Sequence, residues 1–155
     1  MTTIEEKKRL TIEHALYFRK KLQTNDMNSE IVNLANFLKL NGLNKNGSMA
    51  SATLSAEQTP SGYVVEIEVI CPIDSKFQSN EKYQYVESVS IDNALYARYE
   101  GEPEFLQSAH TELASYVKQH NLTAATAMYN LVIKEPILND PTCIMDIYIG
   151  IQAHF

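Results

Sequence analysis

The sequence predicts an α+β fold made of two pseudo-symmetric β-α-β-β units, each with an antiparallel sheet and one helix, and with a cleft between the halves. Three observations predict it: a short segment recurs about 80 residues along the chain, the same order of elements follows each copy, and an acidic-apolar strand closes each half. The composition is that of a globular chain, with 45% apolar and 21% charged residues among 155.

Each half opens with a strand. Residues 14–19 (HALYFR) match residues 93–98 (NALYAR) at four of six positions, and Ala94 follows Ala15 by 79 residues. Apolar and polar side chains alternate over 12–18 and again over 89–99, which predicts a strand with one apolar face. Leu16 and Leu95 are therefore expected to occupy equivalent buried positions.

An amphipathic helix follows each of these strands. In the first half Asn28 or Ser29 is the expected N-cap, and Gly42 stands where a left-handed residue ends a helix. In the second half Pro103 suits the first helical turn. The expected apolar stripes are Ile31, Leu34, Ala35 and Leu38 in the first helix, and Phe105, Leu106, Ala109, Leu113, Tyr116 and Val117 in the second.

A hairpin closes each half. The first pairs residues 48–57 with 63–73 around a turn at 59–62, and the second pairs 126–134 with 143–152. The closing strands align with Asp146 over Glu66, an offset of 80 residues. We therefore expect one domain over 1–155, with a first unit at 10–73, a linker at 74–84 and a second unit at 85–152.

Charge and cysteine content exclude several classes of function. The formal net charge is −6 and basic residues do not concentrate in one patch, so nucleic acid is not an expected partner. Cys71 and Cys143 are far apart and form no CxxC pair, so we expect neither a disulfide nor a bound metal or cofactor. The sequence contains no signal peptide and no apolar stretch that would span a membrane, which predicts a cytoplasmic protein.

Strand parity gathers acidic and aromatic side chains on the sheet face that the helices do not cover. The candidate ligand-binding residues are Glu66, Glu68, Asp146, Tyr17, Tyr96 and Tyr148. A carboxylate removed from water gains most by pairing with a cation, and tyrosine rings add a weaker attraction, so this face suits an organic cation. The alternative is that Arg19 and Arg98, on the same face, already neutralise these carboxylates.

Over residues 10–152 the chain resembles the gyrase-inhibitor-like family, the effector-binding domains of multidrug-sensing transcription activators. The resemblance rests on Tyr99-Glu100-Gly101, on Leu113 and Tyr116 of the second helix, on Asp146-Ile147-Tyr148-Ile149, and on Cys71-Pro72-Ile73 at the end of the acidic strand of the first half. It implies a cleft between the halves in which aromatic side chains and a buried carboxylate receive flat or cationic molecules. The chain departs from the family in having no tryptophan and no helix-turn-helix segment before Ile12.

The leading hypothesis is a small-molecule-binding protein that senses or sequesters an apolar or cationic organic ligand in the cleft between the repeats. The alternative is a protein-interaction module, such as an adaptor, chaperone or immunity partner of a bacterial secreted-toxin locus. Catalysis is not expected, because no Ser/Cys-His-acid pattern can be assigned to the four histidines, although some relatives of this fold are thought to hydrolyse small molecules.

Overall fold

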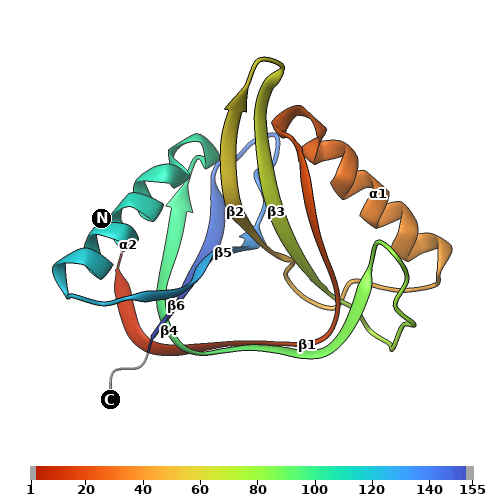
Figure 1. The fold of residues 1–155 in the computed structure, drawn as a ribbon, viewed down its shortest axis with the longest axis horizontal. Coiled ribbons are helices and arrows are strands. Elements are labelled where there is room, and N and C mark those ends of the chain that lie inside the picture. The colour runs from red at the N-terminus through yellow and green to blue at the C-terminus, as the bar shows by residue number, and fades with distance from the viewer. Residues whose placement is uncertain (1–2, 153–155) are drawn as a thin grey trace. The chain divides into compact units, whose positions relative to one another are not determined.

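A computed structural model describes residues 3–152, in which six strands and two helices follow the order β-α-β-β, β-α-β-β (Figure 1). The chain divides into two compact units. Residues 12–89 form one of them, called the first repeat here, and residues 3–11 with 90–152 form the second repeat. The predicted α+β fold of two similar β-α-β-β halves is confirmed.

The first repeat contains most of β1 (Ile4–Gln23), then α1 (Met27–Leu40), β2 (Ala50–Thr59) and β3 (Gly62–Pro72). β3 is the middle strand and pairs antiparallel with both β1 and β2. Phe18 lies opposite Val69 in this register, and Arg19 lies opposite Glu68. Because successive side chains alternate between the faces, Phe18 joins the core with Leu34 and Leu38 of α1, while Arg19 is on the other face.

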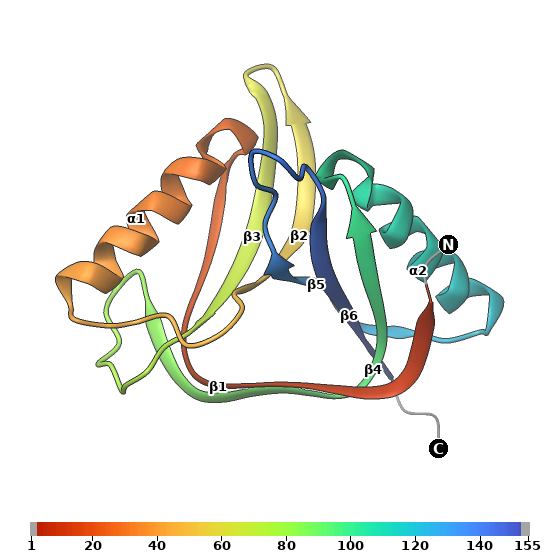
Figure 2. The same cartoon turned by 180° about the vertical axis from the view of Figure 1, so that it is seen from behind.

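The second repeat contains most of β4 (Gln84–Gly101), then α2 (Leu106–Gln119), β5 (Ala124–Lys134) and β6 (Cys143–Ile151). β6 is the middle strand here, paired antiparallel with β4 and β5. Leu95 lies opposite Ile149 and packs under α2, whereas Arg98 lies opposite Asp146 on the helix-free face. The view from behind in Figure 2 shows α2 alongside the strands of its own repeat.

The observed helix ends agree in part with those predicted from the sequence. Gly42 has φ +65° directly after α1, and Pro103 begins the short 3-10 turn that leads into α2, so both of these predictions are confirmed. The predicted cap at Asn28 or Ser29 was wrong. A 3-10 turn at Thr24–Asp26 starts the helical path earlier, so both residues lie inside α1, and the N-cap residue Asp26 makes no side-chain cap.

Each repeat has its own apolar core between sheet and helix. Leu16 and Leu95 are buried in the two cores, as expected from the repeat. Leu34 and Leu38 also face inward, but Ile31 and Ala35 are exposed and Phe105 lies outside the second core, so the predicted stripes were too wide. The burial of Glu30 explains the difference in α1, because it rotates the inward face away from Ile31.

Glu30 is buried because two ammonium groups neutralise it. Lys20 of β1 donates a hydrogen bond to one carboxylate oxygen, and Lys82 Nζ lies 3.1 Å from the other. Burial raises the pKa of Glu30, but the hydrogen bonds and charges of the two lysines outweigh it, so the pKa is lowered. Lys82 belongs to the segment expected as a linker, and the next residue, Tyr83, packs edge-on against Phe18. This segment is therefore attached to the first repeat.

Replacing Leu16 or Leu95 with Ala should lower the free energy of unfolding by about 2–5 kcal/mol, because each leaves a cavity in a closed core. Chemical denaturation measures the loss. Leu40→Ala is the matched control, since Leu40 is 85% exposed and should change stability by less than about 0.5 kcal/mol. A cost for Leu16→Ala or Leu95→Ala no larger than the control's would contradict the assignment of that residue to a core.

Glu30→Gln should destabilise the protein at neutral pH and much less in acid. A carboxyl whose pKa is lowered by folding contributes stability above its unfolded pKa, about 4.3, and that contribution disappears as the pH falls through the folded pKa. Urea unfolding at neutral and acidic pH measures the difference between variant and wild type. Glu81→Gln, an exposed change beside Lys82, is the control and should alter stability by less than about 0.5 kcal/mol.

Candidate functional site

A buried aspartate on the helix-free face of the second repeat is held by two residues of the neighbouring strand. Tyr96 donates its hydroxyl to Asp146 Oδ1 over 2.8 Å. Arg98 donates from Nε to Oδ1 over 2.8 Å and from Nη2 to Oδ2 over 3.0 Å. This two-pronged contact follows from the sheet register, because Arg98 lies directly opposite Asp146. We call Tyr96, Arg98 and Asp146 the Asp146 triad.

In the Asp146 triad the carboxylate is paired, and both of its donors hold their protons firmly. Burial, followed by the hydrogen bond to Asp146, raises the pKa of Tyr96 to about 12, and the contact with Asp146 raises the pKa of Arg98 as well. Both donors therefore keep their protons throughout the neutral range. Tyr148 extends the face, with its ring centroid 5.0 Å from that of Tyr96. The result is an aromatic surface beside a paired carboxylate.

The first repeat contains the same arrangement in a weaker form, called the Glu68 triad. Tyr17 donates its hydroxyl to Glu68 Oε2 over 3.2 Å, and Arg19 donates from Nη2 to the same oxygen over 3.0 Å. Burial and then the charge of Glu68 raise the pKa of Tyr17. Glu66 lies two residues earlier on the same side of β3, opposite Lys21 rather than Arg19. It is half-buried and stands outside this triad.

The register corrects the sequence alignment of the closing strands. Arg98 faces Asp146 and Arg19 faces Glu68, so the structural equivalent of Asp146 is Glu68 and not Glu66. The expected offset of 80 was thus two residues too long. A shift of two leaves every side chain on the same face, which is why the parity argument still selected the correct face. The signal that could have identified the equivalent carboxylate is the Tyr-x-Arg pattern that the two opening strands share. In each repeat the buried carboxylate lies opposite the arginine of this pattern.

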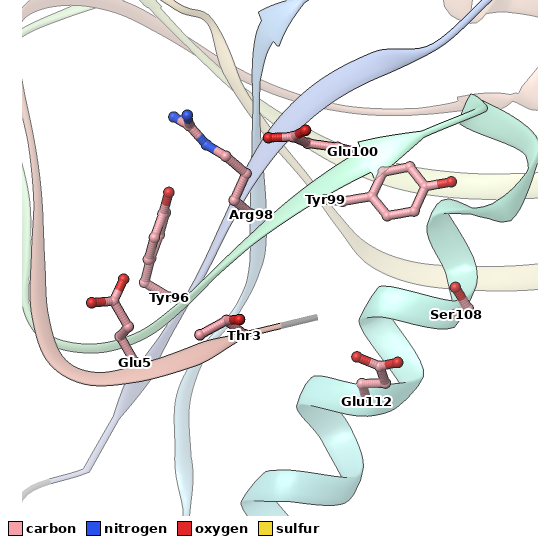
Figure 3. Close-up of a pocket in the computed structure, with 8 residues that line it drawn as sticks. All are labelled: Thr3, Glu5, Tyr96, Arg98, Tyr99, Glu100, Ser108 and Glu112. Atoms are coloured by element: carbon pink, nitrogen blue, oxygen red, sulfur yellow. The ribbon is translucent and has the colours of Figure 1, made fainter. Parts of the chain in front are cut away.

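A pocket of about 660 Å³ borders the Asp146 triad (Figure 3). Its charged lining residues are Glu5 of β1, Arg98 and Glu100 of β4, and Glu112 of α2. Tyr96 and Tyr99 also line it; in Figure 3 Tyr99 extends toward α2, on the other side of β4 from Tyr96 and Arg98. Three carboxylates and one guanidinium give an acidic pocket. The sequence contained no signal for Glu5 or Glu112, which come from segments distant in the chain.

The pocket beside the Glu68 triad differs in size and charge. It measures about 280 Å³ and is lined by Phe18, Arg19, Lys20, Glu81 and Lys82. Its three cationic side chains are all paired, Arg19 with Glu68 and both lysines with Glu30, and Glu81 is the carboxylate of its lining. The two repeats therefore share a triad but differ in the charged side chains around it.

No protein-family model matches the sequence, and no curated protein matches it. Solved structures do match. EcmrR in a complex with DNA superposes with a TM-score of 0.75 at 9% identity, over 99% of this chain and 58% of that chain. The isolated EcmrR C-terminal domain gives a TM-score of 0.71 at 10% identity, covering 99% of this chain and 98% of the domain.

The chain has the fold of the EcmrR C-terminal domain. The family resemblance stated from the sequence is confirmed at the level of the fold, and the chain spans 58% of the EcmrR chain in the DNA complex. A hydrolase from Listeria innocua has a TM-score of 0.56 at 6% identity, over 94% of this chain and 91% of that one. SAV2435 bound to tetraphenylphosphonium has a TM-score of 0.47 at 13% identity, over 99% and 94%, too weak a likeness to transfer its ligand.

The EcmrR-type fold brings the predicted ligand-binding residues together within each repeat. Asp146, Tyr96 and Tyr148 form one group, and Glu68 and Tyr17 form another with Glu66 nearby on the same face. That all six meet in a single cleft stays a prediction. The alternative interpretation is also visible, because Arg98 and Arg19 pair with the two buried carboxylates.

Other chemistry-bearing side chains lie elsewhere in the described chain. His14 bonds to the Tyr85 hydroxyl, and His110 bonds to Asn130. Cys71 and Cys143 are buried and unpaired, and burial raises the pKa of both thiols. Over residues 3–152, no helix is long and apolar enough to cross a membrane.

Proposed function

We propose that the second repeat binds an organic cation in the acidic pocket beside the Asp146 triad, and that the chain senses or sequesters this ligand. The observation that supports the proposal is the charge of the pocket lining, which contains Glu5, Glu100 and Glu112 and one cation, Arg98, while Glu5 also pairs with Lys8. Such a lining attracts positive charge and repels anions. A volume of about 660 Å³ falls in the range of small-molecule sites.

The aromatic surface supports a flat ligand. Tyr96 lines the pocket, and its ring lies against that of Tyr148. The face of a tyrosine ring attracts a cation by about 0.5–2 kcal/mol, and its area adds apolar contact. A delocalised aromatic cation uses both contributions, whereas a small inorganic cation uses only the charge. The roles of Tyr17, Glu66 and Glu68 as further ligand residues stay predictions.

Asp146→Asn should weaken the binding of N-methylacridinium at least about tenfold, or roughly 1.4 kcal/mol, because it removes the buried carboxylate that the cation would pair with. Binding of neutral acridine at mildly alkaline pH should be nearly unchanged. Fluorescence titration measures both affinities.

Asp92→Asn is the matched control for that experiment, since it removes an exposed carboxylate paired with Arg9 in the same repeat. Glu66→Gln measured alongside tests the predicted part of Glu66. Equal losses for acridine and N-methylacridinium would show that Asp146→Asn only disturbs packing, and would contradict a charge-dependent site.

A protein partner is the second candidate function, and one observation favours it. The loop between β5 and β6 exposes Ile137 and Leu138, the latter to 99%, while Lys134 and Asp140 form an ion pair at its base. Neighbouring exposed apolar residues on a loop are typical of an interaction surface. Native mass spectrometry of the purified protein separates the candidates. A retained small molecule supports the ligand, whereas a retained second chain lost on Leu138→Ser supports the partner.

A further inference from the structure

We propose that Arg98 gates the pocket by competition: its guanidinium occupies the Asp146 carboxylate as an internal cation, and an organic cation binds there by displacing it. The inference rests on the proposed function and specifies how that site is regulated. It also explains how one carboxylate can be both paired in the free protein and available to a ligand.

Arg98 both lines the pocket and pairs with the Asp146 carboxylate. Arg98 and Tyr96 line the pocket, whereas Asp146 is not among its lining residues. The side chain of Arg98 is 45% exposed and that of Asp146 only 10%. A cation entering the pocket therefore meets the guanidinium first, and it reaches Asp146 only if Arg98 moves.

The pairing also accounts for why the free protein needs an internal cation. A buried carboxylate without a partner is strongly destabilising, so Asp146 has to be neutralised when no ligand is present. Arg98 meets this need with two hydrogen bonds. A ligand cation then binds only the fraction of molecules in which Arg98 has left, and its apparent affinity is reduced by that fraction.

Glu100 provides a place for the displaced guanidinium. It lies two residues after Arg98 on β4, hence on the same face, and it lines the pocket (Figure 3). Glu100 is exposed, so it can pair with Arg98 without being buried. Besides adding negative charge to the pocket lining, Glu100 acts through Arg98 as a positioning residue.

Arg98→Met tests the gate. It keeps the aliphatic stem and removes the competing charge, so N-methylacridinium should bind about tenfold more tightly than to the wild type, and neutral acridine about equally. Arg9→Met is the matched control. It makes the same change of residue and charge in an exposed pair with Asp92, and it should leave both affinities unchanged.

Two further variants test the mechanism. Arg98→Lys keeps the charge but not the two-pronged contact, so its affinity should lie between those of wild type and Arg98→Met; it also serves if Arg98→Met fails to fold. Glu100→Gln should weaken cation binding more in the wild type than in an Arg98→Met background, because only the wild type has a guanidinium for Glu100 to receive. That non-additivity would not arise if Glu100 simply attracted the ligand.

The outcomes separate the gate from the proposed function. Charge-dependent binding by the wild type, with Arg98→Met and Arg98→Lys no tighter, would overturn the gate alone. Tighter binding by Arg98→Met would support the gate, even where the wild type binds too weakly to measure. Absence of cation binding by the wild type and by both Arg98 variants would overturn the gate and the cation site together.

Discussion

Each repeat has a buried carboxylate on the sheet face that no helix covers. The need to pair this charge is the constraint on which the rest of the repeat depends. Asp146 and Glu68 are each less than a tenth exposed, and a charge so far removed from water must be paired and hydrogen-bonded. In both repeats the partners come from the strand directly opposite, as a tyrosine and an arginine two residues apart. A slip of one residue would turn Arg98 into the core and Leu95 out of it, so the triad and the core specify the same register.

The sequence predicted the fold because the two periodicities are properties of single segments. Alternation identified the strands and their apolar faces, and 3.6-residue spacing identified both helices. The prediction from the sequence failed where the burial of a residue depends on a partner distant in the chain. From the sequence, Glu30 would be expected on the solvent-exposed face of α1. Lys20 and Lys82 allow it to be buried instead, and Ile31 is exposed as a result. No pattern within the helix contains that information.

The residues of the candidate site could be predicted from the sequence to a similar extent as the fold. Parity correctly separated the helix-free side chains from the core, and it named both triad carboxylates and both triad tyrosines. Parity reports the side on which a residue lies and not which residue it faces, so it could not distinguish Glu66 from Glu68 as the equivalent of Asp146. The pocket lining could not be predicted from the sequence. Glu5 and Glu112 come from a strand end and a helix, and the positions of these two elements follow from tertiary packing.

Under the proposed function, the triad by itself does not determine what is bound, because both repeats contain it. If it did, Glu68 and Asp146 would be equivalent sites, yet lysines flank the Glu68 triad and glutamates flank the Asp146 triad. Near Asp146 the pocket lining contributes the carboxylates of Glu5, Glu100 and Glu112 and one guanidinium, that of Arg98, and Glu5 also pairs with Lys8. The tighter contact of Arg98 fits this excess of carboxylates, and so does an attraction for a second cation. Near Glu68, Lys20 and Lys82 are paired with Glu30, and Glu81 is the carboxylate of the pocket lining. Under the proposed function, one repeated framework provides a structural ion pair in the first repeat and a ligand site in the second, and the surrounding charges decide which.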